Sequence, residues 1–141
     1  MAERGIETSN YTVRSVRGRD VPSYLAASDA GLAFIKPCFS KLASSPTKNA
    51  EYLACGLPLI INAGIGDSDA LVTREEVGAL VSQFTETEYA RAFARIEEFA
   101  RNAEQTRRRT REVAEKLFDV KVVGAERYVR LYNRILAGQG D

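Results

Sequence analysis

The 141-residue sequence contains no histidine and only two cysteines, Cys38 and Cys55. Without histidine, the chain lacks the commonest general base and the imidazole ligands of most zinc sites. Two cysteines cannot complete a structural zinc site, and we expect them to be reduced thiols of a cytoplasmic protein. Any chemistry must therefore use carboxylates, lysines, hydroxyl groups, backbone amides or a bound substrate. We expect no metal ion and no cofactor.

The chain also lacks an excess of charge of either sign and a long hydrophobic run. It has 20 Lys and Arg residues and 19 Asp and Glu residues, which gives a formal net charge of +1. This balance argues against nucleic acid as a partner. No apolar segment is long enough to span a bilayer, and residues 1–5 lack the apolar core of a signal peptide. Hydrophobic residues make up 45% of the chain, which is typical of one globular domain.

Apolar segments alternate with helical segments from residue 11 to residue 81. The segments with strand composition are 11–16, 31–35, 59–61 and 79–81. Helices are predicted between them at about 21–27, 45–55 and 68–74. This alternation indicates an α/β fold with a Rossmann-like parallel sheet flanked by helices.

The remainder of the chain, after the segment 79–81, has only helical patterns. An apolar stripe at helical spacing is formed by Tyr89, Ala92, Phe93, Ile96 and Ala100. A charged helix is predicted over about 103–117, and a last helix over about 125–136. We therefore expect a polar leader (1–10), a Rossmann-like core (11–85) and C-terminal helices packing on that core (86–141), all in a single domain.

The helix predicted at 45–55 has the clearest boundary signals. Ser45 is the predicted N-cap, with Pro46 at the first helical position, where its missing N–H costs nothing. Gly56 fits a left-handed C-terminal cap, and Pro58 prevents continuation of the helix. Because this helix follows a strand of the sheet, its free amides and its dipole favour phosphate binding at its amino end.

Polar side chains gather at that amino end. Ser44, Ser45 and Thr47 offer hydroxyl donors, and Lys48 places a positive charge where it opposes the helix dipole, as an anionic ligand would explain. Lys48 and Glu51 share a helix face. One side chain can meet a phosphate while the other accepts hydrogen bonds from sugar hydroxyls. The alternative is an ordinary surface ion pair between Lys48 and Glu51.

Two further segments are candidates for ligand binding. Gly64 and Gly66 follow a strand and permit close backbone approach or an anion-binding nest, although the third glycine of the dinucleotide fingerprint is absent. The alternative is a plain turn between strand and helix. The basic run of Arg107, Arg108, Arg109 and Arg111 suits an acidic membrane surface, and a solvated helix face is the alternative.

The segment from Ser44 to Ile60, SSPTKNAEYLACGLPLI, resembles the signature of GT-B glycosyltransferases, most closely the retaining glycosyltransferase family 4. The resemblance extends over most of residues 11 to 137. It implies the C-terminal, nucleotide-sugar-binding domain of a metal-independent enzyme that transfers a sugar to an acceptor hydroxyl. By this resemblance Glu51 would bind the ribose hydroxyls. Lys48 and the amides of residues 45–47 would lie near the diphosphate or the sugar.

The sequence departs from the family pattern in two ways. Many members carry a second glutamate eight positions before the one that matches Glu51, and here that position is Ala43. Only four strands are predicted where about six are usual. We therefore expect a fragment of a larger enzyme, inactive alone, whose missing N-terminal domain binds a carbohydrate or glycolipid acceptor at the inner face of a membrane. No residue is assigned a catalytic role.

Two other functions remain open from the sequence. The chain can be half of a nucleotide-sugar epimerase or hydrolase, or a non-catalytic α/β interaction module with no affinity for nucleotides. A truncated sheet would also expose an apolar edge, which predicts self-association.

Overall fold

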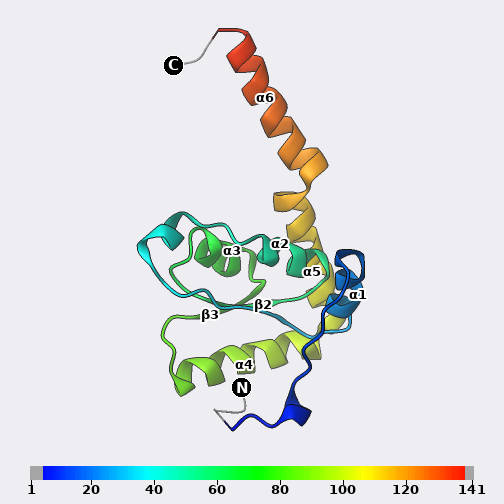
Figure 1. The fold of residues 1–141 in the computed structure, drawn as a ribbon, viewed down its shortest axis with the longest axis vertical. Helices are drawn as coiled ribbons and strands as arrows, with labels where there is room; N and C mark the ends of the chain where they lie inside the picture. Colours follow the sequence, from blue (N-terminus) through cyan, green and yellow to red (C-terminus); the bar gives the residue numbers. More distant parts are fainter. Residues whose placement is uncertain (1–4, 139–141) are drawn as a thin grey trace.

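The structure is a computed structural model that describes residues 5–138, so the first four residues of the predicted leader lie outside it. Its centre is a sheet of three parallel strands in the order β1 (Gly31–Ala33), β2 (Leu59–Asn62) and β3 (Gly78–Val81). Helices cover both faces of this sheet (Figure 1). The predicted α/β fold, with a Rossmann-like parallel sheet flanked by helices, is confirmed.

The helices follow the predicted segments closely. They are α1 (Val21–Ala26), α2 (Thr47–Ala54), α3 (Ser68–Glu75), α4 (Glu86–Arg101), α5 (Ala103–Phe118) and α6 (Ala125–Leu136). Short 3₁₀ turns occur at Thr8–Asn10, Gly18–Asp20 and Phe39–Ala43, and a π-helical turn at Val120–Gly124 precedes α6. From Glu86 onward the described chain is therefore helical, as its patterns predicted.

The strand predicted at 11–16 is wrong. These residues form no strand, and Val13 is 82% exposed. Alternating strand formers describe only the local chain, whereas a strand also needs a neighbour that accepts and donates its backbone hydrogen bonds. None of the described strands provides one, so the described sheet begins at β1 instead.

The two faces of the sheet are covered by different helices. Leu59 and Ile61 of β2 pack with residues of α2, α3 and α5, while Ile60 packs with residues of α4. Figure 1 shows α2, α3 and α5 on one side of the sheet and α4 on the other. This arrangement follows from the topology, because two right-handed crossovers that run in the same direction place α2 and α3 on one face.

The apolar stripe of α4 differs in part from the prediction. Ala92 and Ile96 are buried against the sheet as expected. Phe93, however, is 54% exposed and Ala100 is also exposed, while Phe99 is buried and completes the stripe. Both Phe99 and Ala100 lie within one turn of Ile96, so periodicity alone does not choose between them.

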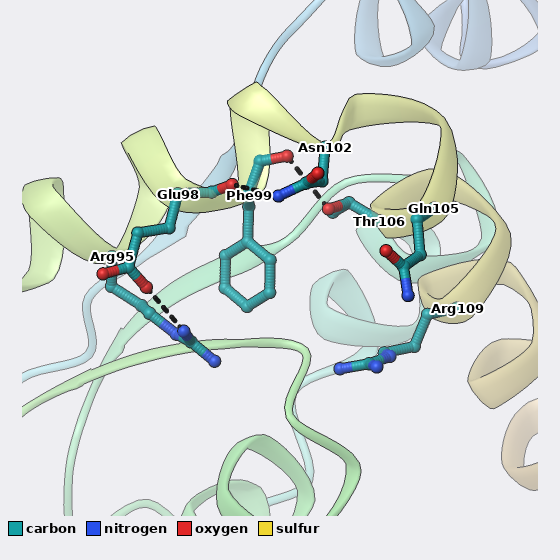
Figure 2. Close-up of a pocket in the computed structure, with 7 residues that line it drawn as sticks. All are labelled: Arg95, Glu98, Phe99, Asn102, Gln105, Thr106 and Arg109. Atoms are coloured by element: carbon teal, nitrogen blue, oxygen red, sulfur yellow. Dashed lines mark hydrogen bonds and ion pairs between the residues drawn. The ribbon is translucent and has the colours of Figure 1, made fainter.

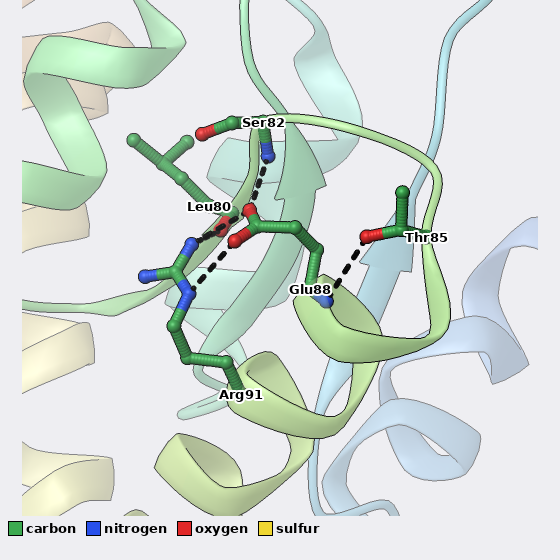
Figure 3. A network of polar contacts seen from close by, with 5 residues as sticks. All are labelled: Leu80, Ser82, Thr85, Glu88 and Arg91. Carbon is green, nitrogen blue, oxygen red and sulfur yellow. Dashed lines mark hydrogen bonds and ion pairs between the residues drawn. The ribbon is translucent and has the colours of Figure 1, made fainter.

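A polar network fixes the turn from β3 into α4 (Figure 3). Thr85 Oγ1 accepts a hydrogen bond from the amide of Glu88 at 3.3 Å, and the Glu88 carboxylate accepts one from the amide of Ser82 at 2.9 Å. Arg91 donates to Glu88 and to the carbonyl oxygen of Leu80, both at 2.9 Å. The hydrogen bond with Arg91 and that from Ser82 lower the pKa of Glu88, and the Glu88 carboxylate raises the pKa of Arg91. The network is therefore structural.

α6 extends away from the rest of the molecule (Figure 1). None of its residues is buried, in contrast to α4 and α5. Its exposed apolar side chains are Tyr128, Val129, Leu131, Tyr132, Ile135 and Leu136. These residues recur at helical spacing, but they do not contribute to the core formed by the described residues.

β1 is an edge strand of the described sheet, and its Leu32 is 50% exposed. Phe34, which directly follows β1, is 43% exposed. Exposed apolar edges favour pairing with a second chain. We expect the chain to self-associate with increasing concentration, and a charge at the edge, Leu32→Lys, to weaken this association. Light scattering across a range of concentrations measures the mass. A mass that stays monomeric throughout, in both proteins, would contradict the expectation.

Candidate functional site

The amino end of α2 lies one residue later than predicted. Pro46 is the N-cap rather than the first helical residue, because its ψ of 115° is extended, and Ser45 therefore lies outside the helix. No side chain caps this end. Among residues 5–138, no hydrogen bond engages the amides of Thr47 and Lys48. The helix thus presents free donors, together with the positive end of its dipole.

The carboxyl end of α2 agrees with the prediction. Gly56 has a φ of 84°, the left-handed conformation expected of a C-terminal cap. The amide of Leu57 donates to the carbonyl oxygen of Tyr52 at 3.0 Å, and the amide of Gly56 donates to that of Leu53 at 2.9 Å. These are the two bonds of a Schellman motif, which stops the helix and directs the chain into β2.

The two loops predicted to bind a ligand touch each other. Gly66 has a φ of 53°, and a Cβ atom at this position would overlap the carbonyl oxygen of Ser44. Ser44 and Gly66 lie in different βα loops, both at the carboxyl end of the sheet, where ligands bind in open parallel sheets. The structure thus brings together two predicted residues that are far apart in the sequence.

Gly64 is held differently. Its amide donates to both carboxylate oxygens of Asp69, each at 3.1 Å. A Cβ atom at Gly64 would meet no atom within 4 Å, although its φ of 81° is left-handed. The chain's own carboxylate therefore occupies the position where this amide would otherwise bind an anion.

Lys48 and Glu51 are exposed, and no ion pair joins them or engages either side chain among the described residues. The alternative of an ordinary surface ion pair is therefore not realised. Glu51 lines a groove of about 290 Å³ between α2 and α5, which we call the α2–α5 groove. Its other polar residues are Arg111, Glu115 and Asp119.

A larger hollow lies on the other side of α2. This α2–α3 cavity has a volume of about 500 Å³ and is lined by Ser45, Asn49, Asp67, Ser68 and Arg74, among others. Phe118, at the end of α5, lines both the α2–α3 cavity and the α2–α5 groove. Of the predicted residues, Ser45 thus borders the cavity and Glu51 the groove, whereas Lys48 lines neither.

Sequence reasoning missed several residues of these two hollows. Asn49 could have been recognised from the helical spacing of α2. It lies one turn before Leu53, and both residues are on the buried face of the helix. A polar residue at such a position needs a hydrogen-bond partner. Arg74, Phe118 and Arg127 gave no local signal, since their place at a hollow depends on how α3, α5 and α6 are arranged. Arg111 was recognised only as part of the basic run, not as a residue of the groove.

A further cavity of about 350 Å³ lies where α4 meets α5 (Figure 2). Arg95 is 2.6 Å from Glu98 and lies 4.6 Å from the centre of the Phe99 ring. Arg109 pairs with Glu76 at 3.2 Å. Both cations are thus engaged within the chain. Because α4 follows the carboxyl end of β3 and runs back along the sheet, this cavity is near the amino ends of the strands, away from the predicted site.

Three of the four arginines in the basic run contact the chain itself. Arg107 donates to the carbonyl oxygen of Ser28 at 3.1 Å, and Arg109 pairs with Glu76. Arg111 pairs with Glu115 at 3.2 Å and donates to the carbonyl oxygen of Ala54 at 3.3 Å. The run therefore serves intramolecular contacts. Within residues 5–138, no helix combines the length and the apolar character that a bilayer crossing requires.

Comparisons with protein-family models, with curated proteins and with solved structures found no match.

Proposed function

We propose that this chain is the nucleotide-sugar-binding domain of a glycosyltransferase, which moves a sugar from a nucleoside diphosphate to an acceptor hydroxyl. The sequence motif from Ser44 to Ile60 suggests this function. One structural observation carries the proposal further. Glu51 presents a carboxylate without an ion-pair partner in the α2–α5 groove, on the same helix whose amino end is uncapped.

The spacing of these two features fits one nucleotide. Thr47, with a free amide, and Glu51 are four residues apart, which corresponds to about 6 Å along a helix. Ribose hydroxyls and a diphosphate group of one nucleotide are separated on this scale. A carboxylate accepts hydrogen bonds from hydroxyl groups, and helix amides donate to phosphate oxygens. The two groups of the ligand would therefore meet chemically matched groups of the chain.

The same features supply what the reaction needs from a donor domain. When the sugar leaves, negative charge develops on the departing nucleoside diphosphate. The free amides of α2 and the Lys48 ammonium group would stabilise this charge without a metal ion. Transfer also requires an acceptor held in place, which in this proposal is the task of a separate N-terminal domain at the inner face of a membrane. We therefore propose donor binding, with little transfer, for this chain alone.

The proposal predicts that the chain binds a nucleoside diphosphate through Glu51. Thermal unfolding with millimolar UDP, GDP or ADP and their sugar conjugates should show a higher midpoint with one base. Glu51→Ala should weaken that binding about tenfold or more, because it removes charge-assisted hydrogen bonds to the ribose. Since Glu51 is exposed, the variant should keep the stability of the parent protein.

A matched control is Glu97→Ala, which removes an exposed carboxylate from α4 on the other face of the sheet. It should leave nucleotide affinity unchanged. Binding that survives Glu51→Ala would contradict the assigned role. Absence of binding with every nucleotide would favour a non-catalytic interaction module. Hydrolysis or epimerisation of the bound nucleotide sugar would favour the alternative that the chain is half of a nucleotide-sugar hydrolase or epimerase.

A further inference from the structure

A second polar site lies on the opposite side of α2 from Glu51. Asn49 and Glu51 are two residues apart, which places their side chains about 200° apart around the helix axis. Asn49 is only 3% exposed and lines the α2–α3 cavity, whereas Glu51 lines the α2–α5 groove. The α2–α3 cavity and the α2–α5 groove therefore lie against different faces of α2.

Asn49 has an unmet hydrogen bond at the cavity. Its Nδ2 donates to the Ser68 hydroxyl oxygen at 3.2 Å, but its Oδ1 is buried without a partner among residues 5–138. The Ser68 hydroxyl can satisfy only one end of the amide, so either orientation of the amide leaves one polar atom unpaired. Buried polar atoms are nearly always hydrogen-bonded, so this one needs a partner that a water molecule or a ligand group would supply.

Asn62 shows the contrast. It is also buried, yet both ends of its amide are used within the chain. Its Oδ1 accepts a hydrogen bond from the amide of Ile35 at 2.7 Å, and its Nδ2 donates to the carbonyl oxygen of Ala63 at 3.3 Å. Asn62 is therefore satisfied within the fold, whereas one amide atom of Asn49 is left without a partner among the described residues. A hydroxyl group, which can act as donor or acceptor, is able to satisfy it.

The rim of the cavity favours an anion. Arg74 of α3 and Arg127 of α6 line it, and neither forms an ion pair or a side-chain hydrogen bond with the described residues. Of the two acidic residues in the lining, Glu75 is already paired with Lys116 at 3.0 Å, which leaves Asp67. The described lining therefore contains two unpaired guanidinium groups and one unpaired carboxylate, near the uncapped amino end of α2.

We propose that the α2–α3 cavity binds a sugar phosphate, with a sugar hydroxyl at Asn49 and Ser68 and the phosphate at Arg74 and Arg127. The volume of about 500 Å³ is within the range of small-molecule sites. The sugar phosphate is recognised by both of its parts, because the buried amide needs a hydroxyl and the arginines need an anion. The proposal does not rest on the proposed nucleotide function: Glu51 lies on the opposite face of α2, although both sites lie near the amino end of that helix.

Calorimetric titration of the full chain tests the proposal with three probes: glucose 6-phosphate, inorganic phosphate and glucose. We expect glucose 6-phosphate to bind about tenfold more tightly than phosphate, since it adds the hydrogen bond to Asn49. Glucose alone lacks the anionic group and should show no binding. Equal affinity for glucose 6-phosphate and phosphate, or no binding of either, would overturn the proposal.

Variants separate the two parts of the site. Arg74→Gln and Arg127→Gln should each weaken glucose 6-phosphate and phosphate about tenfold without loss of stability, because both arginines are exposed. Arg108→Gln makes the same change at an exposed arginine outside the cavity and should leave affinity unchanged. Affinity that falls equally in all three variants would show a general charge effect and overturn the site.

Asn49→Leu tests the hydroxyl contact. We expect it to abolish the preference for glucose 6-phosphate over phosphate while phosphate still binds. A preference that survives in the folded variant would overturn the role of Asn49. If this variant does not fold, the Arg74 and Arg127 variants still test whether the ligand binds in the α2–α3 cavity. Glu51→Ala should leave glucose 6-phosphate binding unchanged, and a loss there would show that the ligand occupies the nucleotide groove instead.

Discussion

Gly66→Ala is expected to lower the free energy of unfolding by about 3 kcal/mol, measured by denaturant titration. Two costs add at this position. A left-handed φ of 53° is unfavourable for alanine, at about 1–2 kcal/mol. The new Cβ atom would also overlap the carbonyl oxygen of Ser44, which is backbone and cannot rotate away like a side chain. The loop before α2 and the loop before α3 must therefore separate.

Gly64→Ala is the matched control for this prediction. Gly64 also has a left-handed φ, 81°, but a Cβ atom there would meet nothing within 4 Å. It should therefore lose only the conformational part, about 1 kcal/mol. A similar loss in both variants would show that the contact between Ser44 and Gly66 contributes nothing. That outcome would remove the structural reason for placing the two loops in one ligand site.

Features with local signals were predictable from the sequence. α2 and its glycine cap depend on Gly56 and Pro58, whose conformational preferences act within a few residues. β2 was recognisable because a short apolar run before a turn is typical of a strand covered on both faces. The α/β class followed from the alternation of such segments.

Features that depend on distant partners were not predictable in the same way. Residues 11–16 have the composition of a strand, but no described strand pairs with them. Pro46 fixes its own φ, which suits both an N-cap and a first helical residue, so its ψ decided the start of α2. Which polar atoms of Asn49 find a partner depends on α3, which brings Ser68 beside the amide nitrogen. In each case the deciding contact comes from elsewhere in the fold.

Leu53→Ala is expected to lower the free energy of unfolding by about 3 kcal/mol. Leu53 is fully buried, and it packs in the cluster that joins α2 to β2, α3 and α5. Alanine at this position removes apolar contacts and leaves a cavity that the surrounding strands and helices cannot fill completely. Denaturant titration should show a lower midpoint with an unchanged slope, because the surface exposed on unfolding stays the same.

Leu136→Ala makes the same chemical change at a residue that is 83% exposed, on α6. Its effect should stay within about 0.5 kcal/mol. The comparison measures where the stability of this chain is located. A large loss at Leu53 with almost none at Leu136 means that the sheet and its covering helices fold as a unit, while α6 adds little. Equal losses would mean that α6 is packed in solution, and its exposed arrangement would then be wrong.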